Sequence, residues 1–150
     1  LSLPFSNKAY HIDDTAFIYL ADQIAKDSLR PYSFNFEWGS RSGSATKNIL
    51  DTPLISYYIA LITLLFGRTE IILHVSFLVF PIIAGISFYF IAKKFIKWPM
   101  VATLVMLASP IFLVSSQNLM PDVPMLSLFL LSFLIFLEGV DRKNHKLLLL

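Results

Sequence analysis

Long apolar segments alternate with short polar ones along the last two thirds of the chain. Residues 71–92, 99–116 and 123–137 contain no Asp, Glu, Lys or Arg. A helix of about 20 such residues crosses the roughly 30 Å hydrocarbon layer of a bilayer. We therefore predict transmembrane helices over residues 71–93, 99–119 and 123–139, with the start of a further one over residues 146–150.

The apolar segment at residues 53–67 is shorter than these. Only 14 residues precede its glycine, which gives a helix of about 21 Å. These 14 residues are fewer than the roughly 17 that a membrane-spanning helix needs. We predict a half-inserted or interfacial helix here.

Residues 1–52 are polar and rich in loop-forming residues, so we expect them to form a large first outer loop. One part of the loop has the spacing of an amphipathic helix, because Phe17, Leu20, Ala21 and Ile24 recur on one face. Such a helix suits a juxtamembrane position along the membrane surface.

Basic residues mark one side of the membrane. Short loops rich in Lys and Arg face the cytoplasm, and both basic loops of this chain (residues 93–97 and 142–146) do so if the three predicted spans alternate in direction. Asp122 then faces the outer compartment, together with the first outer loop and its Asp13, Asp14 and Asp51. This shared side is the main functional clue in the sequence.

The composition agrees with a membrane protein. Hydrophobic residues make up 56% of the chain and charged residues 15%, whereas soluble domains carry roughly a quarter of charged residues. The net charge of +2 is small and its basic residues are dispersed, so nucleic acid is not an expected partner. Cysteine is absent, which excludes disulfides, thiol catalysis and thiolate metal sites. We predict an all-α fold: a polytopic membrane helix bundle with amphipathic juxtamembrane helices in its first outer loop.

The adjacent Asp13 and Asp14 are the first candidates for chemistry. Carboxylates at a membrane surface can act as a catalytic base or bind a cation, but an aspartate before a helix also serves as an N-cap. Asp51 precedes the short apolar helix and has the same two interpretations. Asp122 lies where two apolar spans meet, and a carboxylate at membrane level is a functional hypothesis by default, with an interfacial helix cap as the alternative.

Two further residues could contact a substrate or a metal. His11 could ligate a metal or donate to a phosphate, although a single loop histidine usually does neither. Lys47, with other basic residues of the loop, could hold an anionic head group or remain solvated. The sequence shows no phosphate-binding glycine loop and no zinc-type histidine spacing. No cofactor is therefore certain, and a divalent cation stays open.

Four motifs follow one another in a specific order: DDTAFIYLA at 13–21, ILDTPLISYYIALITLLFG at 49–67, ISFYFIAKKF at 86–95 and SQNLMPDVPMLSLFLL at 116–131. Their order and spacing resemble the GT-C superfamily of integral-membrane glycosyltransferases. The nearest branch is the protein O-mannosyltransferase and aminoarabinose-transferase-like one.

This resemblance implies a function at the outer face of the plasma (inner) membrane. A sugar would move from a polyprenyl-phosphate donor to a lipid, glycan or protein acceptor. Asp13 would be the base that activates the acceptor, Asp14 its partner, and Asp51 and Asp122 candidates for metal or substrate binding. In this family an arginine usually occupies the position of His74.

Two other classes of function stay open. A secondary transporter would use membrane-level aspartates to bind a coupling ion, but such residues usually lie near the midplane. A non-catalytic assembly subunit would use the same residues only as helix caps. We also expect the chain to be an internal fragment of a longer enzyme and inactive alone.

Overall fold

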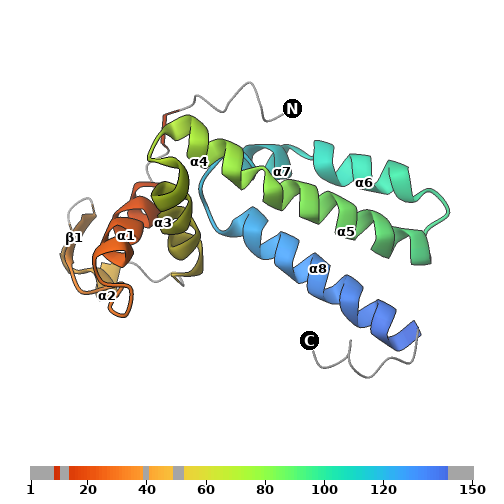
Figure 1. The fold of residues 1–150 in the computed structure, drawn as a ribbon. Coiled ribbons are helices and arrows are strands. Elements are labelled where there is room, and N and C mark those ends of the chain that lie inside the picture. Colours follow the sequence, from red (N-terminus) through yellow and green to blue (C-terminus); the bar gives the residue numbers. More distant parts are fainter. Residues whose placement is uncertain (1–8, 11–13, 39–40, 49–52, 142–150) are drawn as a thin grey trace. The chain divides into compact units, whose positions relative to one another are not determined.

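The computed structural model describes residues 9–10, 14–38, 41–48 and 53–141. The described residues are mainly helical, so the predicted all-α fold class is confirmed, with a small two-stranded hairpin added to it. The chain divides into two compact units (Figure 1). Among the described residues, we call those of 9–76 with 118–120 the helix–hairpin unit, and those of 77–117 with 121–141 the long-helix unit.

The helix–hairpin unit begins with α1 (Asp14–Lys26), the amphipathic helix that the sequence predicts. Its apolar residues Phe17, Leu20 and Ile24 are buried, and α1 packs against α3 (Leu54–Phe66). Leu20 and Ile24 also join Phe36 of the hairpin in one hydrophobic cluster. The apolar face of α1 is thus covered by the protein's own side chains.

A β-hairpin lies within residues 1–52, for which the predicted elements are a loop and a helix only. Strand β1 (Asn35–Trp38) pairs antiparallel with β2 (Arg41–Ser44), so that Phe36 lies opposite Gly43, and the short helix α2 (Ala45–Asn48) follows. Apolar and polar residues alternate from Phe34 to Trp38, which is the two-residue period of a half-buried strand. The hairpin was therefore not predicted, although the alternation of apolar and polar residues indicates a strand here.

Helix α3 occupies the segment predicted as a short apolar helix. It ends at Gly67, whose positive φ of 86° suits glycine and whose N–H donates to the Thr63 carbonyl oxygen at 3.0 Å. Leu64, Leu65 and Phe66, the last residues of α3, are 83%, 61% and 65% exposed. Helix α4 (Glu70–Phe77) follows after a short turn. The depth of α3 in the bilayer stays a prediction.

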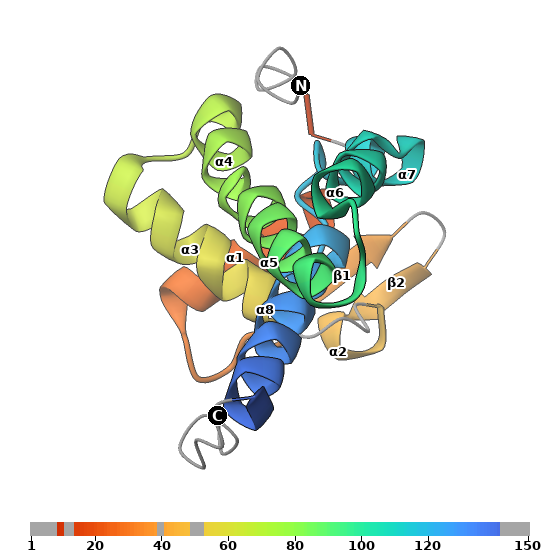
Figure 2. The same cartoon turned by 90° about the vertical axis from the view of Figure 1, so that its right-hand side faces the viewer.

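The long-helix unit contains α5 (Val79–Phe95), α6 (Pro99–Ala108), α7 (Pro110–Ser115) and α8 (Asp122–Asp141). Figures 1 and 2 both show α5 between α6 and α8, in agreement with its packing against each of them. Small buried residues of α5, among them Ala84, Gly85 and Ser87, allow its neighbours to approach closely.

Two helical stretches are long and apolar enough to cross a membrane. They are Glu70–Phe95, with 26 residues, and Asp122–Asp141, with 20 residues, on the criteria of length and composition. Both coincide with segments predicted to span the membrane. Their crossing, and the boundaries of the other predicted segments, stay predictions.

The segment predicted as a single helix over residues 99–119 is divided into α6 and α7. Ser109 between them is extended, with φ −62° and ψ 137°. A residue before proline is driven out of the helical region by the proline ring, and Pro110 follows. The Ser109 Oγ then accepts a hydrogen bond from the Phe112 N–H at 3.4 Å and caps α7. The segment is thus divided at Ser109 in the structure, and its role as a membrane span stays a prediction.

Candidate functional site

The acidic residue that begins α1 is completely buried in the helix–hairpin unit. Asp14 is 0% exposed, and its Oδ1 accepts a hydrogen bond from the backbone N–H of Leu119 at 2.9 Å. A buried carboxylate is costly unless such partners stabilise it. The contact joins residues 105 positions apart in the sequence. Asp14 therefore anchors the segment at residues 118–120 to the start of α1.

Tyr10, four residues before Asp14, stacks on His74 of α4. The centroids of the two rings lie 6.1 Å apart and their planes meet at 17°. Burial raises the pKa of the Tyr10 phenol above its ordinary value, and the nearby Glu70 carboxylate raises it further. Tyr10 therefore keeps its proton at neutral pH and remains a hydrogen-bond donor beside the start of α4.

The hydrogen bond of His74 identifies the tautomer of its neutral ring. Its Nδ1 lies 2.8 Å from the backbone carbonyl oxygen of Glu70, and a carbonyl oxygen only accepts. Nδ1 must therefore carry the proton, so that in the neutral ring Nε2 has a lone pair. Nε2 is buried, and it has no hydrogen-bond partner among the described residues.

An ion pair lies at a pocket between α1 and α3. Arg68, just after α3, contacts Asp22 of α1, and its Nη1 lies 2.9 Å from Oδ1 and 2.8 Å from Oδ2. The pocket has a volume of about 270 Å³. Its walls are mainly apolar, and the residues that line it are Ile18, Ala21, Asp22, Ala25, Ile59, Ala60, Thr63, Leu64, Arg68 and Leu73.

Asp122 belongs to the other unit. It is the first residue of α8, it is exposed, and it lines a second pocket of about 320 Å³ with Ser109, Phe112 and Ser115. The pocket walls are mostly apolar, so the Asp122 carboxylate is their charged group. Since Asp14 and Asp122 lie in different units, the convergence of the acids stays a prediction.

The remaining candidates from the sequence are only partly described. Asp13, His11 and Asp51 lie outside the described residues. Lys47 is in α2, and its side chain is not among those described. In the described part of the chain, no group of three or more His, Asp or Glu side chains is placed to hold a metal ion.

Sequence reasoning missed several polar residues of the helix–hairpin unit. Tyr10, Asp22, Glu70 and Arg68 were not predicted as site residues, and His74 was named only as a position where the family usually has arginine. A signal existed for two of them, because Arg68 directly follows the glycine that ends α3 and His74 is four residues from Glu70 on one helical face. The pairing of Arg68 with Asp22 across 46 residues had no such signal.

Comparison with known proteins identifies one family. The family model described as dolichyl-phosphate-mannose-protein mannosyltransferase matches residues 51–150, which are two thirds of the chain. The comparison with curated proteins gives no match, and neither does the comparison with solved structures. The matched region contains Asp51, His74 and Asp122, whereas Asp13 and Asp14 precede it.

Proposed function

Because the chain belongs to the dolichyl-phosphate-mannose-protein mannosyltransferase family, a family of GT-C-type membrane glycosyltransferases, we propose that it transfers a sugar from a polyprenyl-phosphate donor. The transfer takes place on the non-cytoplasmic face of the membrane. The family match over residues 51–150 is the observation that carries this proposal. The two long apolar helices support a protein that meets its lipid-linked donor within the bilayer.

The proposed reaction is a substitution at the anomeric carbon of the sugar. The acceptor hydroxyl forms the new C1–O bond, the bond between C1 and the phosphate oxygen breaks, and polyprenyl phosphate leaves with the electron pair. The hydroxyl proton passes to a carboxylate base. Holding donor and acceptor together in one orientation supplies a large part of such a rate enhancement, and the base adds to it.

We assign the base to Asp13 and a supporting role to Asp14. Asp14 is anchored by the Leu119 N–H, so a structural function for it and a chemical function for its neighbour are compatible. Asp51, Asp122, His11 and Lys47 are the proposed contacts to substrate or to a divalent cation. The acceptor is a hydroxyl of a lipid, a glycan or a protein.

The assignment of the base is tested in membranes that contain the full-length protein. The Asp13→Asn variant should lose transfer of labelled mannose from a polyprenyl-phosphate mannose donor by at least about 100-fold, with unchanged protein level. Asp27→Asn is the matched control, because Asp27 lies just beyond α1. In the described part of the chain, the one hydrogen bond found for its side chain is from the backbone N–H of Leu29. Its activity should remain normal. Full transfer by Asp13→Asn would refute Asp13 as the base.

A further inference from the structure

The pocket between α1 and α3 combines an apolar wall with one charged rim. Ala21, Ala25 and Ala60 leave the space open because their side chains are small, and Ile59 and Leu73 form apolar walls. The ion pair of Asp22 and Arg68 lies at the same pocket. Ligand pockets are usually roughly 300–1,000 Å³. At about 270 Å³ this pocket lies just below that range, so its size suits a head group and the first carbons of a chain rather than a whole lipid.

The guanidinium group of Arg68 has donors to spare. A guanidinium carries five N–H groups, and here a single nitrogen, Nη1, makes both contacts to Asp22. No other hydrogen-bond partner of Arg68 is found in the described part of the chain. The side chains of Arg68 and Asp22 are 45% and 39% exposed, and such an ion pair contributes only about 0–1 kcal/mol to stability. An incoming anion can therefore share Arg68 or displace Asp22.

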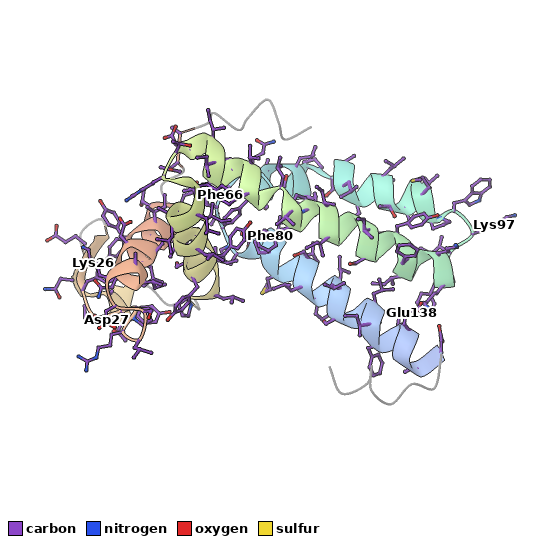
Figure 3. All side chains as sticks on the ribbon, viewed as in Figure 1. Lys26, Asp27, Phe66, Phe80, Lys97 and Glu138 are labelled. Carbon is purple, nitrogen blue, oxygen red and sulfur yellow. The ribbon has the colours of Figure 1, made fainter. Side chains whose placement is uncertain are left out.

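The environment of Arg68 is that of a lipid contact. Leu64 lines the pocket and is 83% exposed, and Leu65 and Phe66 follow it at 61% and 65%. Figure 3 labels Phe66 at the end of α3, immediately before Gly67 and Arg68. Three large exposed apolar side chains in a row suit contact with acyl or prenyl chains rather than with water.

We propose that this pocket binds the phosphate group and the first carbons of a phosphate-headed lipid. The phosphate meets the free N–H groups of Arg68, and the chain passes along the apolar wall and Leu64. Arginine suits this role because its planar donor group matches phosphate oxygens. The isoprenoid donor and a bulk anionic phospholipid both present this chemistry. The isoprenoid source rests on the proposed function.

Binding to the full-length protein in nanodiscs of zwitterionic lipid tests the site, with farnesyl phosphate and farnesol as probes. Arg68→Gln should weaken binding of farnesyl phosphate by about tenfold or more and leave farnesol binding unchanged. Lys97→Gln, the same loss of one positive charge at an exposed residue outside the helix–hairpin unit, is the control and should have no effect. Asp22→Asn should strengthen binding of farnesyl phosphate, because it removes the anion that competes for Arg68.

The apolar wall is tested separately. Ala25→Leu fills part of the pocket from an exposed position on α1, so that folding is preserved, and it should weaken binding of farnesyl phosphate and farnesol alike. Equal effects of Arg68→Gln and Lys97→Gln, or no effect of Ala25→Leu on either probe, would overturn the proposal.

Competition distinguishes the two lipid sources. Displacement by farnesyl phosphate but not by phosphatidylglycerol supports the isoprenoid donor, and equal displacement supports a bulk phospholipid. The proposed function fails by itself if sugar transfer proves independent of Asp13 while Arg68-dependent binding persists. The pocket proposal fails by itself if Arg68→Gln transfers sugar with normal donor binding.

Discussion

Asp14 shows how one buried carboxylate can connect distant parts of a chain. Asp14→Ala removes the acceptor of the Leu119 N–H, and an unpaired buried donor costs about 1–3 kcal/mol. We expect the thermal unfolding midpoint to fall accordingly. Asp14→Asn keeps an acceptor oxygen in the same place and should cost less. Unfolding of both variants in detergent measures the difference, and equal losses would show that the contact with Leu119 is not what Asp14 provides.

The raised pKa of Tyr10 has a consequence for stability at high pH. A phenol whose pKa is higher in the folded protein than its ordinary value of 10.0 stabilises the fold below that pH. This contribution disappears as the pH rises through the folded pKa. We expect a phenol absorbance titration of the folded protein to show a late component above pH 10 that is absent from Tyr10→Phe. The stacking on His74 is kept in that variant, so an unchanged titration would contradict the burial of this hydroxyl.

The sequence predicted the local structure around the site residues better than it predicted which residues they contact. A helix beginning near Asp14 follows from its acidic start and from the spacing of Phe17, Leu20 and Ile24. The burial of Asp14 does not follow, because its partner Leu119 is brought close only by the tertiary fold. Arg68 has the same difficulty, since a pair formed across 46 residues leaves no local pattern.

Among the elements, the helices were predictable and their interruptions less so. Apolar length located α3, α5 and α8, because burial in lipid or protein demands long apolar segments. The break before Pro110 depends on how neighbouring groups satisfy the freed backbone, which membrane helices can do in more than one way. The hairpin was missed although Phe34, Phe36 and Trp38 alternate with polar residues.

Gly85 and Gly67 are expected to resist substitution for different reasons. A Cβ at Gly85 of α5 would lie 3.3 Å from Cδ1 of Leu107, a flexible side chain, so Gly85→Ala should be nearly neutral. Gly85→Leu overpacks this contact with α6 and should cost about 1–3 kcal/mol. At Gly67 space is open, but φ 86° with ψ 172° is a conformation that almost only glycine adopts, so Gly67→Ala should cost about 1–3 kcal/mol.

Thermal unfolding midpoints of these three variants, measured in one detergent, give the order of their stabilities. We expect Gly85→Ala to be the most stable of the three. A Gly67→Ala variant as stable as the parent would mean that the turn after α3 adopts another conformation. A tolerated Gly85→Leu would mean that α5 and α6 are not in close contact.

For the whole molecule, the family match and the proposed base lie in different parts of the chain. The family match covers residues 51–150, which include both candidate spans. Asp13 and Asp14, the proposed base and its support, lie in the preceding region. The hydrogen bond from Leu119 to Asp14 connects the two regions, because residue 119 is within the matched part. The region before residue 51 is therefore bound to the family-matched region by at least this contact.

The orientation of the chain in the membrane decides whether the proposed reaction is possible. Lys97 projects from the connection between α5 and α6 (Figure 3), whereas Asp122 begins α8. If the α6–α7 segment crosses the bilayer, these two positions lie on opposite sides. Residues 1–150 contain no cysteine, so single Lys97→Cys and Asp122→Cys variants each place one thiol at a known position in this region.

In intact cells, an impermeant maleimide should label Asp122→Cys but not Lys97→Cys, and permeabilised cells should label both. Thr46→Cys, an exposed position in α2 of the first outer loop, should behave like Asp122→Cys. The reason is that basic loops remain on the cytoplasmic side, which sends the acidic turn and the first loop outward. Labelling of Lys97→Cys and Asp122→Cys from the same side would mean that α6 and α7 turn back within the membrane. Asp122 would then face the cytoplasm if both sites were protected, and it could not share an outer site with Asp13.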